Sequence, residues 1–77
     1  MKEKIIEILK EIRPEFDFAE SSDFIEDGYL DSFDIVTIID ELEKKFSVII
    51  DGVEVIPENF CTVEAIEKLV NKSQKRV

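Results

Sequence analysis

The sequence lacks the residues on which most small hydrolases and metal modules depend. It contains no histidine and a single cysteine, Cys61. Without a Ser-His or Cys-His pair and without a Cys/His cluster, neither an autonomous hydrolase nor a zinc module is expected. One cysteine cannot form an internal disulfide. Because Cys61 stands just before an expected helix start, we interpret it as a small buried or half-buried apolar residue without a function of its own.

Glycine and proline are also scarce, with two residues of each among 77. Hydrophobic residues make up 44% of the chain and charged residues 38%, which is typical of a soluble, largely helical domain. No apolar run approaches the roughly 18 residues of a membrane span, and the start, Met1-Lys2-Glu3-Lys4, is amphipathic, unlike a secretory signal. A chain of this length buries one modest core, so we expect a single cytoplasmic domain over residues 1–77, working as a monomer.

Basic residues are absent from one long segment. Residues 14–43 contain eleven Asp or Glu and neither Lys nor Arg, whereas the rest of the chain has eight acids and ten bases. The net charge of −9 is therefore concentrated in this segment. Such a surface disfavours nucleic acid and anionic membranes and attracts partners with basic surfaces. On charge alone, a solvated acidic face that maintains solubility is the alternative.

The first helical pattern covers residues 2–12. It ends there because Pro14 disfavours helical backbone at Arg13. Residues 13–30 show no steady period and predict a long loop pinned by aromatic side chains. A loop of that length in a compact domain is either functional or a sign that the neighbouring helices are wrongly assigned. The apolar face of the first helix consists of Ile5, Ile8, Leu9 and Ile12.

The second helix is expected to begin after the N-cap residue Asp31 and to end at about Phe46. Asp34, three positions after Asp31, completes a short-armed capping box. At about 100° per residue, Phe33 points away from the core face and Val36 lies at its margin. An aromatic side chain is therefore expected on the outside of the helix start. The core face consists of Ile35, Ile38, Ile39, Leu42 and Phe46.

The last third of the chain predicts a short turn and a final helix. Residues 57–60, Pro-Glu-Asn-Phe, begin with a proline suited to a first helical position, and Thr62 is placed as the cap of the last helix. A hairpin that joins residues 47–50 to residues 53–56 around Asp51-Gly52 is an alternative reading of the segment between the second helix and this turn.

Ser32 is the residue that the sequence places best for chemistry. In Gly28-Tyr29-Leu30-Asp31-Ser32-Phe33 its hydroxyl falls in the exposed first turn of an acidic helix. The free N–H groups and the positive dipole end of a helix favour a phosphodiester anion at that place. The charges of Asp31 and Asp34 oppose such an anion, so these two are better explained as caps and as contacts for a modifying enzyme or its metal. A solvated first-turn serine is the plain alternative.

These residues resemble the phosphopantetheine-dependent acyl carrier protein family, which includes D-alanyl and other aminoacyl carriers. The resemblance implies an all-α, four-helix bundle with a long first loop and a short third helix. It also implies that Ser32 receives a 4′-phosphopantetheine arm from a holo-carrier synthase that uses coenzyme A and magnesium, with Asp31 as part of the motif. The arm then carries an acyl or aminoacyl group as a thioester. The matching residues are Gly28-x-x-Asp31-Ser32-Phe33, Val36, Leu42, Glu43, Phe46 and Pro57-Glu58-Asn59-Phe60.

The chain departs from fatty-acid carriers at three positions, so the resemblance leaves the cargo and pathway open. Phe33 follows the serine where many fatty-acid carriers have Leu, a choice shared with D-alanyl carriers and several carriers of specialised pathways, and Thr37 and Lys44 replace frequent acids. The expected partners are the synthase and acyl- or aminoacyl-loading and transfer enzymes with basic surfaces. The chain itself is expected to be non-catalytic. The expected partner-binding residues are Phe33, Asp34, Val36, Asp40, Glu41 and Glu43.

Two rival functions come from other classes. A calcium loop could start at Asp23, because Asp27 and Gly28 fall at its fifth and sixth positions, but Ile25 and Asp34 replace ligands at the third and twelfth. An unmodified acidic helical adaptor would keep the acidic face and would not need the hydroxyl of Ser32.

Overall fold

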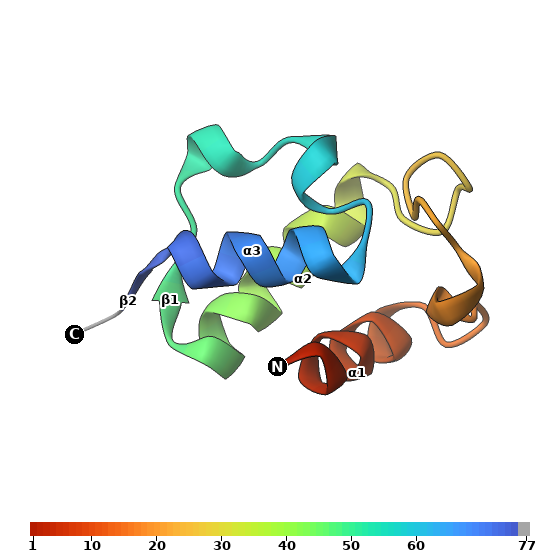
Figure 1. The fold of residues 1–77 in the computed structure, drawn as a ribbon, viewed down its shortest axis with the longest axis horizontal. Helices are drawn as coiled ribbons and strands as arrows, with labels where there is room; N and C mark the ends of the chain where they lie inside the picture. Colours follow the sequence, from red (N-terminus) through yellow and green to blue (C-terminus); the bar gives the residue numbers. More distant parts are fainter. Residues whose placement is uncertain (76–77) are drawn as a thin grey trace.

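Three α-helices surround one apolar core in the computed structural model, which describes residues 1–75 (Figure 1). They are α1 (Lys2–Ile12), α2 (Ser32–Phe46) and α3 (Val63–Lys72). The boundaries expected from the sequence are confirmed at both ends of α1 and α2 and at the start of α3, where the Thr62 side chain accepts a hydrogen bond from the Ala65 N–H. α1 packs against both α2 and α3. The chain is therefore all-helical in its main architecture.

The core is built from the apolar faces that the helical periodicity predicts. Each fully buried aliphatic or aromatic side chain of this kind contributes about 1.5 to 3 kcal/mol to folding through removal of its surface from water. Phe33 and Val36 lie outside the core, as expected. The buried apolar residues of the helices are Ile5, Ile8 and Leu9 of α1, Ile38 and Leu42 of α2, and Ile66, Leu69 and Val70 of α3.

The long loop between α1 and α2 is ordered by its aromatic side chains. Phe16 stacks on Tyr29 with ring centroids 4.4 Å apart, and Phe18 meets Phe24 edge to face at 5.0 Å. Phe18 and Phe24 are buried in the core, and the Phe24 N–H donates to the carbonyl of Cys61 at 2.7 Å. The loop also contains a 3-10 turn, Phe18–Glu20. Its length is thus supported by its own packing, and the helices on either side are correctly assigned.

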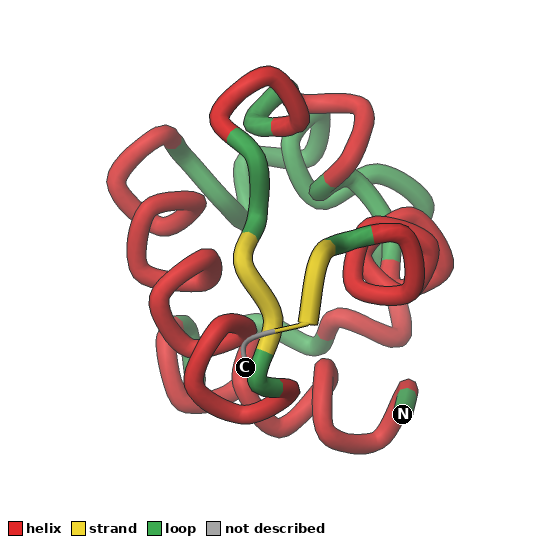
Figure 2. Tube along the Cα trace, turned by 90° about the vertical axis from the view of Figure 1, so that its left-hand side faces the viewer, coloured by secondary structure: helices red, strands yellow, loops and turns green. Residues whose placement is uncertain are grey.

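The segment after α2 does not form the alternative hairpin. β1 (Val48–Ile49) pairs with β2 (Gln74–Lys75) in antiparallel register, which joins the end of α2 to the end of α3 (Figure 2). The residues around Gly52 form a 3-10 turn, Gly52–Glu54, because the Asp51 side chain accepts from the Val53 N–H. Val48 and Ile50 are buried on either side of exposed Ile49, and this fixes β1 against the core.

The expected short third helix is a single 3-10 turn, Pro57–Asn59. Proline starts the turn at its first position, and the turn ends at Phe60, whose side chain is buried in the core. The Asn59 side chain donates to the backbone carbonyl of Glu54 at 2.7 Å and holds the turn back against the preceding segment. In the part of the chain that the structure describes, the α-helices therefore number three, and the four-helix count is not confirmed. Within residues 1–75, none of the helices combines the length and the hydropathy that a membrane span requires.

Gly28 is required by the backbone at the start of the Ser32 motif. Its φ is +76°, in the left-handed region that side chains with a Cβ adopt at a cost, although an added Cβ would meet no atom within 4 Å. The turn lets the Tyr29 and Leu30 N–H groups both donate to the carbonyl of Phe24. This brings the chain from the aromatic loop to the first residue of α2.

Gly28→Ala is expected to lower the free energy of unfolding by about 1 kcal/mol, because alanine is strained at a positive φ. Gly52→Ala is the matched control, since Gly52 also has open space around it but no positive φ. Urea unfolding of both variants measures the difference. Equal stabilities for the two would contradict a conformational role for Gly28.

Candidate functional site

The start of α2 is fixed by a reciprocal capping box. The Asp31 carboxylate accepts from the Asp34 N–H at 3.0 Å, and the Asp34 carboxylate accepts from the Asp31 N–H at 3.1 Å. Both bonds satisfy N–H groups that the first turn of a helix would otherwise leave without a partner. The hydrogen bond from the Asp34 N–H, more than any other effect, lowers the pKa of Asp31. The Asp31 carboxylate is therefore held in its ionised form beside Ser32.

Ser32 is the first residue of α2 and is exposed to solvent. Its position between the two members of the capping box sets the direction of its backbone, because Asp31 and Asp34 bond to each other across it. An exposed hydroxyl on a fixed first turn, at the positive end of a 15-residue helix, suits covalent attachment of a phosphodiester. These features fit the group that the sequence implies.

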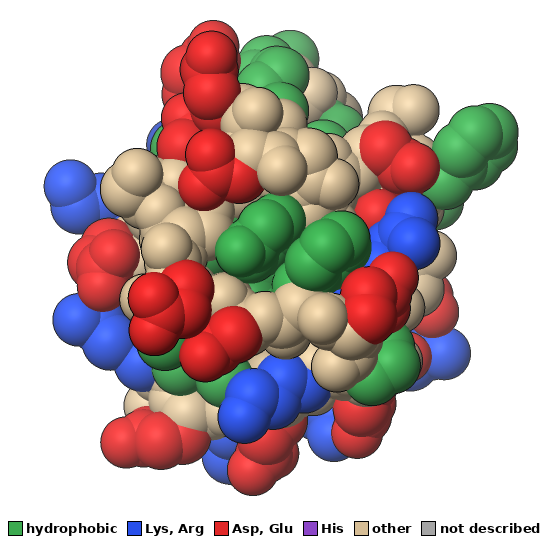
Figure 3. All heavy atoms as spheres, turned by 90° about the vertical axis from the view of Figure 1, so that its right-hand side faces the viewer, with side chains coloured by type: hydrophobic (Ala, Val, Ile, Leu, Met, Phe, Trp, Pro, Cys, Tyr) green, Lys and Arg blue, Asp and Glu red, His purple; other side chains and the backbone are tan. Residues whose placement is uncertain are grey.

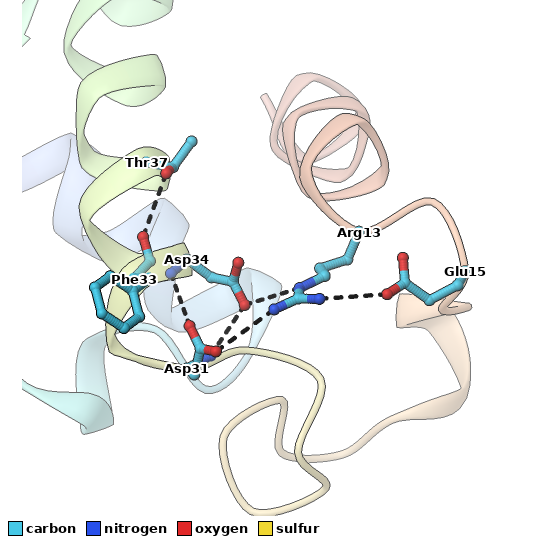
Figure 4. A network of polar contacts seen from close by, with 6 residues as sticks. All are labelled: Arg13, Glu15, Asp31, Phe33, Asp34 and Thr37. Atoms are coloured by element: carbon cyan, nitrogen blue, oxygen red, sulfur yellow. Dashed lines mark hydrogen bonds and ion pairs between the residues drawn. The ribbon is translucent and has the colours of Figure 1, made fainter.

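Arg13 joins the capping box to the end of α1 (Figure 4). Its Nε lies 2.9 Å from Asp34 Oδ2, and its two terminal nitrogens lie 3.4 Å from Glu15 Oε2 and 3.5 Å from Asp31 Oδ2. The Asp34 side chain is bonded in this network, and the residue is only 8% exposed. The hydrogen bond and charge of Asp34 raise the pKa of Arg13. The sequence interpretation gave Arg13 no role beyond the end of the first helix.

Two apolar side chains are exposed on the first two turns of α2. Phe33 is 83% exposed and Val36 is 66% exposed. Figure 4 shows the Phe33 ring pointing away from the Arg13 network, on the other side of the helix start. Phe33 does not pack against the aromatic side chains of the long loop, where Phe16 and Phe18 make the ring contacts with Tyr29. The outward position that the periodicity predicts for Phe33 is confirmed.

The acids expected on α2 differ in how they are held. Asp40 is exposed and pairs with Lys44 at 3.0 Å, which raises the pKa of Lys44. Glu43 accepts from the Ile50 N–H at 3.0 Å and so supports the segment after the helix. Glu41 is half-buried. For Asp34 the structure offers a different role from the expected surface contact, because its carboxylate is turned into the capping network.

Acidic side chains also lie at the end of the molecule formed by the long loop, with Lys and Arg side chains among them (Figure 3). Figure 3 views this end and shows Asp and Glu spread around exposed apolar side chains. Part of this charge has local structural uses. Asp23 accepts from the Ile25 and Glu26 N–H groups, and Asp27 accepts from the Ser21 hydroxyl at 2.7 Å.

The loop carboxylates do not form the calcium site weighed as a rival. Within residues 1–75, no three His, Cys, Asp or Glu side chains are arranged to hold a metal ion.

Cys61 is half-buried, as expected, and its Sγ donates to the Glu58 carbonyl at 3.3 Å.

Comparison with known proteins relates this site to one protein family. No curated protein and no solved structure matches the chain. A family model described as the phosphopantetheine attachment site matches residues 1–70, which include all three α-helices except the last two residues of α3. Proteins of this family carry covalently attached 4′-phosphopantetheine. The chain belongs to the family of phosphopantetheine carrier proteins.

Proposed function

We propose that the chain is a carrier that holds acyl or aminoacyl intermediates as thioesters on a 4′-phosphopantetheine arm attached to Ser32. The observation that carries this proposal is the exposed serine between the two members of a capping box, in a chain of the phosphopantetheine family. In the attachment step, Ser32 Oγ forms a bond to the β-phosphorus of coenzyme A and the pyrophosphate bond breaks. Adenosine 3′,5′-bisphosphate leaves, and the hydroxyl proton passes to a base on the synthase.

The charges around Ser32 act on a phosphodiester at this position in opposite directions. The helix start contributes a positive dipole end, while Asp31 and Asp34 contribute negative charge. Arg13 compensates part of that charge, because it contacts both carboxylates. The terminal thiol of the arm supplies the thioester chemistry, and the domain supplies an anchored, exposed site for it. We propose that the chain acts in the cytoplasm as a monomer and that residues 1–77 form one carrier domain.

The proposed partner surface combines Phe33 and Val36 with the neighbouring acids of α2. Exposed aromatic side chains of this kind serve as anchors that fill a pocket, and charges around them steer association and set orientation. A holo-carrier synthase and loading or transfer enzymes with basic rims around an apolar pocket fit this surface. Asp40 and Glu41 are its exposed and half-buried acids, and Glu43 borders it. Phe33 directly after the serine is shared with D-alanyl carriers and with several carriers of specialised pathways, so D-alanyl or other aminoacyl cargo is the alternative to acyl cargo.

Incubation with coenzyme A, magnesium and a holo-carrier synthase is expected to add one phosphopantetheinyl group to the protein. Ser32→Ala should abolish the addition, whereas Ser22→Ala, which removes another exposed hydroxyl in the acidic segment, should leave it complete. Intact-mass analysis measures both. Modification that persists in Ser32→Ala, or unmodified protein across synthases of different specificity, would refute the proposal.

Binding of the synthase is expected to weaken as salt is added and to depend on local acids. Asp40→Lys should weaken it about fivefold at low ionic strength, because a steering charge next to the anchor changes sign. Glu64→Lys is the matched control, since Glu64 is also an exposed acid paired with one lysine, Lys2, but on α3. Titration of the two variants at two salt concentrations provides the measurement. The steering account fails if both reversals have the same effect.

Phe33→Ala is expected to lower the free energy of unfolding by under about 1 kcal/mol, because the ring is mostly in water. The same variant should be modified at Ser32 several times more slowly, since the anchor is lost. Phe24→Ala, which empties a core position, should instead cost about 3 to 5 kcal/mol. Urea unfolding and initial modification rates test both effects. A large loss of stability in Phe33→Ala with normal modification of the folded fraction would assign Phe33 to packing.

A further inference from the structure

Arg13 lies at the end of α1, directly before Pro14. Because Pro14 follows it, Arg13 leaves the helical region, with φ −133° and ψ 76°, while its N–H still closes α1 on the carbonyl of Leu9. The backbone of α1 therefore stops there, and the side chain of its C-cap extends across to the first turn of α2, 21 residues later in the sequence (Figure 4).

Arg13 contacts the same carboxylate oxygen of Asp34 that accepts the capping hydrogen bond at the start of α2. Asp34 Oδ2 accepts from Arg13 Nε at 2.9 Å and from the Asp31 N–H at 3.1 Å. Asp34 is 8% exposed as a residue, and a charged side chain that is largely buried costs free energy unless it is paired or hydrogen-bonded. Arg13 supplies the countercharge and lies within 3.5 Å of Asp31 as well. Both residues that bracket Ser32 are thus contacted by one guanidinium from the C-cap of α1.

We propose that Arg13 is a positioning residue for the modification of Ser32, an inference that rests on the proposed carrier function. It fixes the Asp31–Asp34 box to the rigid end of α1, so that the first turn of α2 and its serine hydroxyl are presented in one orientation. It also removes part of the negative charge that would oppose an incoming phosphate. Arg13 does not touch the reacting atoms and acts through Asp34 and Asp31.

The kinetic test compares Arg13→Gln with wild type at a range of carrier concentrations, using coenzyme A, magnesium and a holo-carrier synthase. The kcat of modification is expected to fall about tenfold, less than the roughly 100-fold that a misplacement of about 1 Å can cost. If Arg13 only stabilises the fold, kcat should be unchanged. The apparent KM should then rise in proportion to the fraction of the variant that is unfolded under the assay conditions, as extrapolated from urea unfolding. That second pattern would overturn the proposal.

Lys2→Gln is the matched control. Lys2 is also a cation of α1 in an exposed ion pair, with Glu64 at 3.5 Å on α3, and its loss should leave kcat within twofold of wild type, roughly the scatter expected for an exposed pair. In an Asp34→Asn background, Arg13→Gln should cost less than about twofold, because its main partner carboxylate is gone. An undiminished tenfold loss in that background would show that Arg13 does not act through Asp34 and would contradict the inference.

Amide hydrogen exchange of the unmodified protein gives a readout that needs no synthase. In Arg13→Gln the Asp31 N–H, which bonds to the Asp34 carboxylate, should exchange about tenfold faster, while the amides of the middle of α2 keep their protection. Should this variant fail to fold, Arg13→Lys, which keeps the charge but loses the planar fork, is expected to show the same two effects in weaker form. Wild-type kcat and exchange in the substituted proteins would overturn the inference alone, whereas an unmodified wild type would overturn the proposed function with it.

Discussion

The reciprocal hydrogen bonds between Asp31 and Asp34 determine where α2 begins, and the functional site depends on that boundary. With the cap at Asp31, Ser32 becomes the first helical residue and is exposed, Phe33 turns outward, and Ile35, Ile38 and Leu42 turn toward the core. A shift of one residue would rotate every side chain of α2 by about 100° and would exchange exposed and buried positions. The cap therefore couples the packing of the domain to the presentation of one hydroxyl.

The acidic segment serves structure and recognition with different carboxylates. Asp23, Asp31 and Asp34 accept backbone N–H groups and so set turns and the helix start, and Glu43 supports the segment that leads from α2 to Ile50. Such acids cannot be reversed without a cost in folding. Asp40 lies on the surface beside one lysine, where a charge can act on a partner at a distance. The net charge of −9 thus overstates the charge that is open to partners.

Helix boundaries could be predicted because they rest on local chemistry. Pro14 ends α1, Asp31 and Thr62 cap α2 and α3, and the 3.6-residue period gives the outward position of Phe33. Contacts between segments that are distant in the sequence could not be predicted in this way. The pairing of β1 with β2 depends on where α3 brings the end of the chain, whereas the short turn predicted at residues 57–60 is confirmed as a 3-10 turn, Pro57–Asn59. The ion pair between Arg13 and Asp34 joins residues that lie 21 positions apart in the sequence. The local signal for it is that one base, Arg13, stands at the edge of residues 14–43, which contain neither Lys nor Arg.

The most direct test of this account maps the modified residue in the protein purified from its native cells. Tryptic cleavage leaves one peptide, residues 11–44, that contains Ser21, Ser22 and Ser32, so tandem mass spectrometry of this peptide distinguishes the three hydroxyls directly. The account predicts a phosphopantetheinyl group on Ser32, at the capped start of α2, with Ser21 and Ser22 unmodified. A group found on Ser21 or Ser22, or a peptide that is never modified while the cells make holo-carriers of other kinds, would contradict it.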